Sequence, residues 1–395
     1  MSMTIDNTTE EVQLMRKLHG KLILEENGFL KKVTQKDSQL NKKATEEYYQ
    51  NWSDKKEADR KDNESQVAGR RERAQKMTNA FYDLVWYGIS NRNLMKDGAI
   101  IVNHGDFDSY VGWGSSFHFA RLYKGDTFEE NIKRHEAFLA LKLGLKKGMR
   151  VLDVGCGVGG PLREIVKSSG YAHVTGINNN AYQIEHCFAH SKKYGLSDHT
   201  DFIKGDFTKM PIPNHTFDAV FSVEATVHAP RLEMVYSEIY RVLKPGGRFA
   251  CYEWCTTDKY DENDVTHRRV IHGIEEGNSI SKLYSTQQCL EAAKSVGFKV
   301  IEEGDVAPID AATVPWYYTL KKPEGLRGLL RSPWGRFYTH HLLTFLDKFN
   351  VVPPGVLATS QLLNDAAEML VAGGEMEIFT PMYFFLVEKP LDATD

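Results

Sequence analysis

The 395-residue chain has little of what marks a secreted or membrane-spanning protein. Its five cysteines are an odd number without regular spacing, which argues against a disulfide scaffold and favours a reducing compartment. No apolar run reaches the roughly 18–20 residues that span a bilayer, and the first eleven residues are polar and acidic, unlike a signal peptide. We therefore expect neither secretion nor a spanning helix, while contact with a membrane surface stays open.

The chain also lacks a strong net charge. Its 49 basic and 53 acidic residues give a formal charge of -4 at pH 7, so no global field attracts nucleic acid, and we expect no nucleic-acid partner. No pair of histidines or cysteines has the spacing of a metal site within one coherent cluster, so no metal is predicted. The length exceeds the roughly 250–300 residues of a single core, which predicts a core domain with additions.

The N-terminal part differs sharply in composition from the rest of the chain. Residues 1–77 mix charges of both signs and contain no proline, which predicts solvated helix with disordered parts. From about residue 80 to residue 123 the sequence becomes rich in aromatic residues, which indicates that something apolar is covered there.

From residue 149 the pattern is that of a parallel α/β sheet, because short apolar runs alternate with helical segments. Strands are expected at residues 149–154, 173–177, 201–204, 217–223 and 248–254, and helices at 161–168, 181–194, 232–243 and 286–296. Residues 244–247 combine a helix stop with a turn signal. Two more extended runs, 299–306 and 376–388, are separated by roughly 70 residues, which we interpret as an inserted cap.

A glycine-rich turn comes directly after the first expected strand. Gly155, Gly157 and Gly160 match the pattern G-x-G-x-x-G, and only glycine lets a backbone turn so tightly and approach a ligand so closely. Dinucleotide oxidoreductases and methyltransferases share this pattern, so the glycines alone leave an NAD-dependent enzyme open. Cys156 is interpreted as a small residue that fills the turn.

Three features of the context favour S-adenosylmethionine. Asp153 places a carboxylate before the loop, where it would repel a pyrophosphate but can hold the ammonium of methionine. Residues 178–180, all asparagine, follow the second strand, where ribose hydroxyls are usually bound. Asp206 and Phe207 follow the third strand and offer a carboxylate to the adenine amino group and an aromatic edge to its ring. The ordinary alternatives are a packing turn for the glycines, a simple turn for the asparagines and a helix cap for Asp206.

The predicted cofactor site comprises Asp153, Gly155, Cys156, Gly157, Gly159, Asn178, Asn179, Asn180, Gln183, Asp206, Phe207 and Glu224.

Together with further motifs on both sides of them, these residues make the chain resemble the sterol 24-C-methyltransferase family. The resemblance extends from about Phe81 to the C-terminus. The similarity is carried by residues 112–119, 134–136, 152–161, 178–180, 204–207, 224–226, 228–230, 236–240, 243–247, 252–254, 257–263, 315–318 and 371–374. The chain departs from the family pattern at residues 107–111, at Val227, where cysteine is usual, and in an insertion of roughly 20 residues at about 86–106.

The resemblance implies a Rossmann-like, seven-stranded class I methyltransferase sheet in which residues 376–388 form the last, antiparallel strand. It suggests four parts: a charged extension (1–80), an aromatic substrate-binding segment with the insertion (81–137), the S-adenosylmethionine domain (138–305) and a C-terminal sterol-methyltransferase cap (306–395). The implied activity adds a methyl group to C24 of a Δ24 sterol, zymosterol- or lanosterol-like, through a carbocation.

Such chemistry needs no general base to activate the alkene. It needs π faces around the cation, for which Tyr110 and Trp113 are the leading candidates, with Phe117, Phe119 and Trp254 beside them. It also needs an acceptor for a late proton, for which Glu224 and His228 are candidates because they follow the fourth strand. His118 completes the predicted catalytic set, as a hydrogen-bonded wall residue rather than as a base.

Two other functions stay open: methyl transfer to another lipid alkene, either a triterpene or a fatty acyl chain, and lipid binding by an inactive relative. Because a sterol resides in a bilayer, we expect peripheral contact with the endoplasmic reticulum or with lipid droplets, through residues 316–318 and 342–349. A homo-oligomer also stays open.

Overall fold

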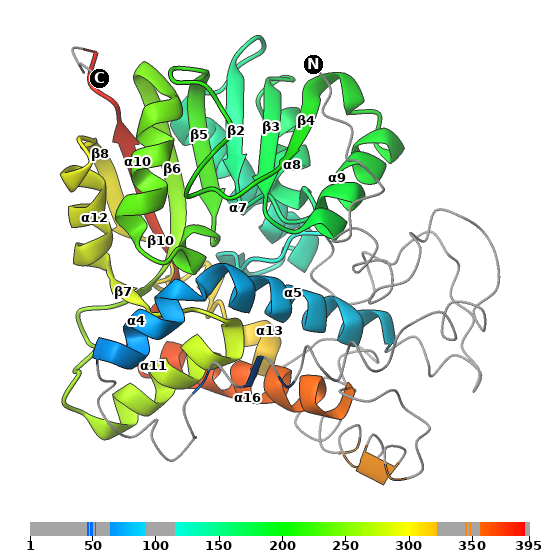
Figure 1. Ribbon diagram of the computed structural model, residues 1–395, viewed down its shortest axis with the longest axis vertical. Helices are drawn as coiled ribbons and strands as arrows, with labels where there is room; N and C mark the ends of the chain where they lie inside the picture. Colours follow the sequence, from blue (N-terminus) through cyan, green and yellow to red (C-terminus); the bar gives the residue numbers. More distant parts are fainter. Residues whose placement is uncertain are drawn as a thin grey trace, which may run out of the picture.

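A computed structural model describes residues 64–91, 115–321 and 356–391, together with residues 46, 48, 49, 52, 338, 341, 344, 345 and 348. Its centre is a sheet with the strand order β4-β3-β2-β5-β6-β10-β8, to which the short β7 is added beside β6 (Figure 1). The strands are β2 (Arg150–Val154), β3 (His173–Asn178), β4 (Thr200–Lys204), β5 (Phe217–Val223), β6 (Leu243–Thr256), β7 (Tyr284–Ser285), β8 (Lys299–Asp305) and β10 (Phe379–Glu388).

The first five strands of this order run parallel, and β10 pairs antiparallel with both β6 and β8. The predicted seven-stranded sheet with a final antiparallel strand is therefore confirmed, with the two-residue β7 as an addition. A separate ribbon joins β1 (Leu122–Tyr123) to β9 (Thr313–Val314).

Helices cover both faces of the sheet and also lie below the ends of its strands (Figure 1). They are α4 (Glu64–Glu72), α5 (Ala74–Asn91), α7 (Phe128–Leu143), α8 (Gly160–Ser168), α9 (Ala181–Lys193), α10 (Leu232–Val242), α11 (Val265–Asn278), α12 (Thr286–Ser295), α13 (Tyr318–Lys321) and α16 (Val356–Glu375). Successive residues of β2 point to opposite faces, so Val151 packs in the core layer beneath α7, α8 and α9, whereas Leu152 and Val154 pack beneath α10 and α12.

Local signals set several helix ends. Thr127 and Glu130 form a capping box that begins α7, and Gly144, with φ +64°, ends it in the left-handed region. The helix stop expected at residues 244–247 is confirmed, because α10 ends at Val242 and β6 begins directly after it at Leu243. The backbone still turns there, since Gly246 has φ +75°.

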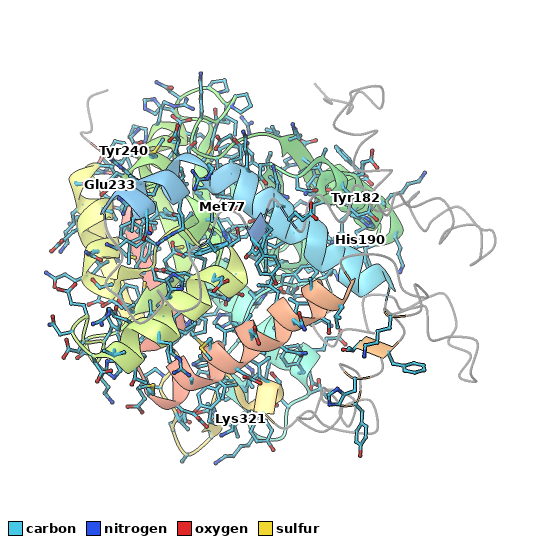
Figure 2. The ribbon with its side chains drawn as sticks, turned by 60° about the horizontal axis from the view of Figure 1, so that its bottom comes forward. Met77, Tyr182, His190, Glu233, Tyr240 and Lys321 are labelled. Atoms are coloured by element: carbon cyan, nitrogen blue, oxygen red, sulfur yellow. The ribbon has the colours of Figure 1, made fainter. Side chains whose placement is uncertain are left out.

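The expectation of a solvated N-terminal helix is wrong for α4 and α5. Val67, Arg70, Ala74 and Met77 are buried, Arg70 to 2 % exposure, because the two helices pack against the rest of the molecule. Figure 1 shows α4 and α5 crossing below the strands, with α11 and α16 beneath them, and Figure 2 shows α5 and α16 on that end of the molecule. α5 also runs without interruption across the expected boundary between residues 80 and 81.

The expected membrane contact of Trp316 also needs correction. We expected it to contact a membrane, but it is 5 % exposed and packs edge-on against Phe119, with ring centroids 4.7 Å apart. Most of the predicted insertion, Tyr110, Trp113 and most of residues 342–349 lie outside the described residues. Among the helices that the structure describes, none has the length and apolarity to cross a membrane.

Candidate active site

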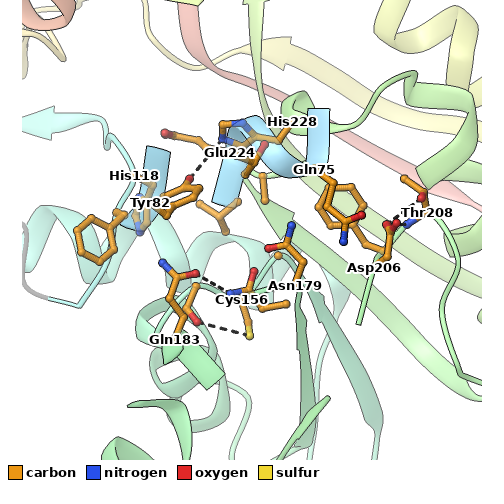
Figure 3. Close-up of a pocket in the computed structure, with 18 of the residues that line it drawn as sticks. Gln75, Tyr82, His118, Cys156, Asn179, Gln183, Asp206, Thr208, Glu224 and His228 are labelled. Atoms are coloured by element: carbon orange, nitrogen blue, oxygen red, sulfur yellow. Dashed lines mark hydrogen bonds between the residues drawn. The ribbon is translucent and has the colours of Figure 1, made fainter. Parts of the chain in front are cut away.

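A cavity of about 300 Å³ lies at the carboxyl ends of β2, β3, β4 and β5 (Figure 3). This is where open α/β sheets bind their ligands. Most of the predicted site residues line it. They come from the glycine loop (Gly155, Cys156, Gly157), from the end of β3 and the start of α9 (Asn178, Asn179, Gln183), and from the segment after β4 (Asp206, Phe207). Glu224, His228 and His118 complete the lining by predicted residues. The fold thus brings most of the predicted site residues together around one cavity.

Three predicted cofactor residues, Asp153, Gly159 and Asn180, do not line the cavity. Gly159 is the N-cap of α8 with φ +77°. Asn180 is the N-cap of α9, and its side-chain oxygen accepts a hydrogen bond from the backbone N–H of Gln183 at 3.1 Å. Gly159 and Asn180 therefore begin α8 and α9 beside the cavity, and their direct contact with the cofactor stays a prediction.

The glycine loop has the shape of a ligand cradle. Gly155 has φ +80°, and a Cβ atom there would lie 2.4 Å from the Cβ of Ala225. Gly157 has φ +53° and faces open space. Cys156 fills the turn as expected, since its Sγ would lie 2.7 Å from a Cβ placed on Gly176. The neighbouring Cys187 and burial raise the pKa of the Cys156 thiol, so it stays protonated.

Asp153 lies just behind the loop as an unsatisfied acceptor. It is 2 % exposed, and its Oδ2 accepts no hydrogen bond from any residue in the described part of the chain. Burial and, to a lesser extent, the nearby Glu136 raise its pKa well above the usual range. A cationic group of a ligand would stabilise this carboxylate, so the site fits the ammonium of methionine.

Amide and carboxylate groups occupy the part of the cavity expected to hold ribose and adenine. Asn178 donates from Nδ2 to Oε1 of Gln183 at 2.6 Å, which fixes both amides at the end of β3. Oδ1 of Asp206 accepts hydrogen bonds from the backbone N–H and the hydroxyl of Thr208, both at 2.8 Å. Asp206 therefore stabilises its own turn and lines the cavity as well, and it caps no helix, because none of the described helices begins between β4 and β5.

Glu224 is held in a strained and buried position at the end of β5. It has φ +54°, which is unusual for a residue other than glycine. Its Oε1 accepts a hydrogen bond from the N–H of Phe119 at 2.8 Å, and its Oε2 accepts one from Nε1 of Trp254 at 2.7 Å. Burial raises the pKa of Glu224 to about 8, although His118 and these two hydrogen bonds act in the opposite direction.

His118 and His228 are in opposite electrostatic environments. Burial alone would lower the pKa of His118, but the contact of its Nε2 with Glu136 Oε1 at 2.9 Å outweighs this and raises it. Its Nδ1 lies 2.7 Å from the carbonyl of Phe119, so both ring nitrogens face acceptors. His118 is thus a hydrogen-bonded wall residue, as expected. By contrast, burial lowers the pKa of His228 to about 4, so that its imidazole is neutral.

Aromatic rings pack behind Glu224. Trp254 lies with its ring centroid 5.9 Å from that of Phe119 and 5.2 Å from that of Phe379, and Trp316 closes the group against Phe119. This aromatic wall (Phe119, Trp254, Trp316, Phe379) surrounds the carboxylate with apolar surface and accounts for its high pKa.

Sequence reasoning missed the wall of the cavity that comes from α4 and α5. Arg71, Gln75, Thr78 and Tyr82 line the cavity from these helices. Their spacing of four, three and four residues puts them on one helical face, and this polar stripe was a signal available in the sequence. Within the described residues, no group of three or more His, Cys, Asp or Glu side chains could hold a metal ion.

The sheet order and the glycine-loop cavity define a class I S-adenosylmethionine-dependent methyltransferase. The family described as "Methyltransferase domain" matches residues 152–251, and the family "Sterol methyltransferase C-terminal" matches residues 326–391. The solved structure of a geranyl diphosphate methyltransferase in complex with SAM is similar in fold, with a TM-score of 0.51 and 17% identity over 69% of this chain and 98% of that one.

The chain belongs to the sterol 24-C-methyltransferase family. It is 42% identical to the sterol 24-C-methyltransferase of Saccharomyces cerevisiae over 97% of this chain and 94% of that protein. It is also 52% identical to cycloartenol-C-24-methyltransferase 1 of Oryza sativa subsp. japonica over 71% of this chain and 81% of that protein. S-adenosylmethionine is accordingly its methyl donor.

Proposed function

We propose that the protein transfers a methyl group from S-adenosylmethionine to C24 of a Δ24 sterol of the zymosterol or lanosterol type, through a carbocation on the side chain. The near full-length similarity to sterol 24-C-methyltransferases carries this proposal. The site supports it, because a buried carboxylate and an aromatic wall adjoin the cofactor cavity.

The lining of the cavity supports the following roles in cofactor binding. Gly155 and Gly157 let the backbone approach it, and Asp153, buried behind this loop, supplies a negative charge for its ammonium. Asn178 and Gln183 offer amides to its ribose, and Asp206 offers a carboxylate to its adenine. When bound, S-adenosylmethionine supplies an electrophilic methyl group on a positively charged sulfur.

The chain's contribution to the chemistry is a dry, electron-rich surface. An isolated alkene attacks the methyl group without a base, so the barrier depends on positioning and on stabilisation of the positive charge. Aromatic faces stabilise a cation by about 0.5–2 kcal/mol each, most when water is excluded. Ionised Glu224 adds a negative charge held by the N–H groups of Phe119 and Trp254.

Turnover of matched sterols tests this function. Purified protein is incubated with S-adenosylmethionine and either a Δ24 sterol or the same sterol with the side-chain double bond reduced, and the products are analysed by mass spectrometry. We expect methylation of the first sterol alone. Turnover only of squalene or of unsaturated fatty acyl chains would instead favour the alternative lipid methyltransferases, and S-adenosylhomocysteine binding without any turnover would favour an inactive lipid-binding relative.

We also propose that the protein associates peripherally with the endoplasmic reticulum membrane or with lipid droplets. Its substrate is a membrane lipid, and two aromatic residues of the C-terminal part are exposed, Tyr338 to 66 % and Phe345 to 58 %. Flotation with phosphatidylcholine vesicles tests this: wild-type protein should float, and the double variant Tyr338→Ser/Phe345→Ser should float less. Equal flotation of both would contradict the assigned contact residues.

A further inference from the structure

We propose that the hydroxyl of Tyr82 takes up the proton that leaves the methylated side chain and passes its own proton to Nε2 of His228. This inference rests on the proposed function and assigns the late proton transfer to a pair of residues from two distant parts of the chain.

The two side chains meet inside the cavity. Tyr82 comes from α5 and His228 from the short helix η4 (Thr226–His228), and both line the cavity that the glycine loop shares. The Tyr82 hydroxyl lies 3.3 Å from Nε2 of His228, and their ring centroids are 5.7 Å apart in an edge-on arrangement. Figure 3 shows this hydrogen bond near Glu224.

The other ring nitrogen of His228 sets the direction of the hydrogen bond. Nδ1 lies 3.3 Å from the backbone carbonyl of Ser279, and a carbonyl oxygen can only accept, so Nδ1 carries the hydrogen. In the neutral ring, Nε2 is then the acceptor, and the Tyr82 hydroxyl donates to it. Burial keeps the imidazole neutral, because it lowers the pKa of His228 to about 4, and burial also raises the pKa of Tyr82, so its hydroxyl stays protonated.

The other titratable groups of the cavity are less suited to this step. Hydrogen bonds from Phe119 and Trp254 hold the carboxylate of Glu224 in place, and its negative charge serves to stabilise the cation. Both nitrogens of His118 face acceptors, which favours its protonated form. The Tyr82 oxygen, by contrast, keeps a lone pair while it donates to His228.

The proton transfer conserves atoms and charge. A C–H bond next to the cationic carbon breaks, and its electron pair forms the new C=C bond and neutralises the cation. The proton binds the Tyr82 oxygen as the Tyr82 proton moves to Nε2 of His228, which becomes an imidazolium with both nitrogens protonated. A weak base is sufficient, because a C–H bond beside a carbocation is far more acidic than an imidazolium.

The test compares Tyr82→Phe with Tyr194→Phe, which removes a hydroxyl from a 45 % exposed tyrosine outside the cavity. We expect Tyr82→Phe to lower kcat about 100-fold, to leave S-adenosylhomocysteine affinity within twofold, and to raise the share of product in which water has quenched the cation as an alcohol. His228→Gln should shift the products in the same way, and Tyr194→Phe should change nothing.

Unchanged kcat and product composition in Tyr82→Phe would overturn the assignment. So would a loss of turnover that only parallels a loss of S-adenosylhomocysteine binding, because that result means a structural role. The wild-type protein is assayed first. If it methylates no Δ24 sterol, that result counts against the proposed function itself and not against the role of Tyr82.

Discussion

Gly155 is the residue at which the cofactor loop has least room. In Gly155→Ala, the new Cβ would lie 2.4 Å from the Cβ of Ala225 on a backbone with φ +80°. Crowding adds a loss of about 1–3 kcal/mol in the free energy of unfolding to the cost of the left-handed backbone, and we expect at least tenfold weaker S-adenosylhomocysteine binding. Denaturant unfolding and calorimetry measure the two effects.

Gly157→Ala is the matched control for this prediction. Gly157 also has a positive φ, +53°, but no atom lies within 4 Å of a Cβ placed there. Only the left-handed backbone opposes the substitution, at a cost of about 1–2 kcal/mol. If both variants were equally stable, crowding against Ala225 would not be what requires glycine at position 155.

Glu224 predicts a pH dependence of cofactor binding. Because burial raises its pKa to about 8, the ligand-free protein holds this proton at neutral pH. A positively charged ligand stabilises the carboxylate, so binding releases the proton, and raising the pH favours binding. The ratio of S-adenosylmethionine to S-adenosylhomocysteine affinity should therefore rise between pH 6 and pH 9, because only the former carries the sulfonium charge.

Calorimetry in two buffers that differ in ionisation enthalpy measures this proton release directly. The variant Glu224→Gln should show an affinity ratio that does not change with pH. A pH-independent ratio in the wild-type protein would place Glu224 away from the charge of the cofactor.

At the scale of elements, α4 and α5 form a wall of the cofactor cavity. The Arg70 Nε donates to the carbonyl of Ser281 at 3.1 Å, and Nη2 of Arg71 donates to the Tyr284 hydroxyl at 3.1 Å, so α4 is tied to the segment around β7. In Figure 3, Gln75 on α5 lies at the end of the cavity where Asp206 and Thr208 lie.

Gln75 should therefore contribute to cofactor affinity. Its amide can donate and accept at once, which suits the edge of an adenine. We expect Gln75→Ala to weaken S-adenosylhomocysteine binding about 3- to 10-fold, as measured by calorimetry. Lys76→Ala is the control, because Lys76 is exposed on the same helix and does not line the cavity. Similar weakening in both variants would mean that α5 acts through its general stability.

Elements whose signals are local could be predicted from the sequence. The alternating strands and the glycine loop were placed within a few residues, because β-rich runs and turn residues act at short range. The packing of α4 and α5 was missed, because the partners of Arg70 and Met77 lie far away in the sequence. The capping role of Asn180 could not be separated from ligand binding in the sequence, since both call for the same side chain at the end of a strand.

At the scale of the whole molecule, a class I methyltransferase sheet provides the cofactor half of the site, and the N-terminal helices close it. The aromatic wall draws its members from four distant regions, around Phe119, Trp254, Trp316 and Phe379. No sequence window contains this cluster, which is why Trp316 looked like a surface residue. Only the family resemblance could connect these rings to one substrate.

The position of the transferred methyl group tests the proposed C24 methylation most directly. The purified protein is incubated with S-adenosylmethionine carrying a CD₃ group and a Δ24 sterol, and the product is analysed by NMR and mass spectrometry. We predict one deuterated carbon bonded to C24, with one equivalent of S-adenosylhomocysteine formed for each sterol consumed. Label on any other carbon, on the sterol hydroxyl or on no sterol at all would contradict it.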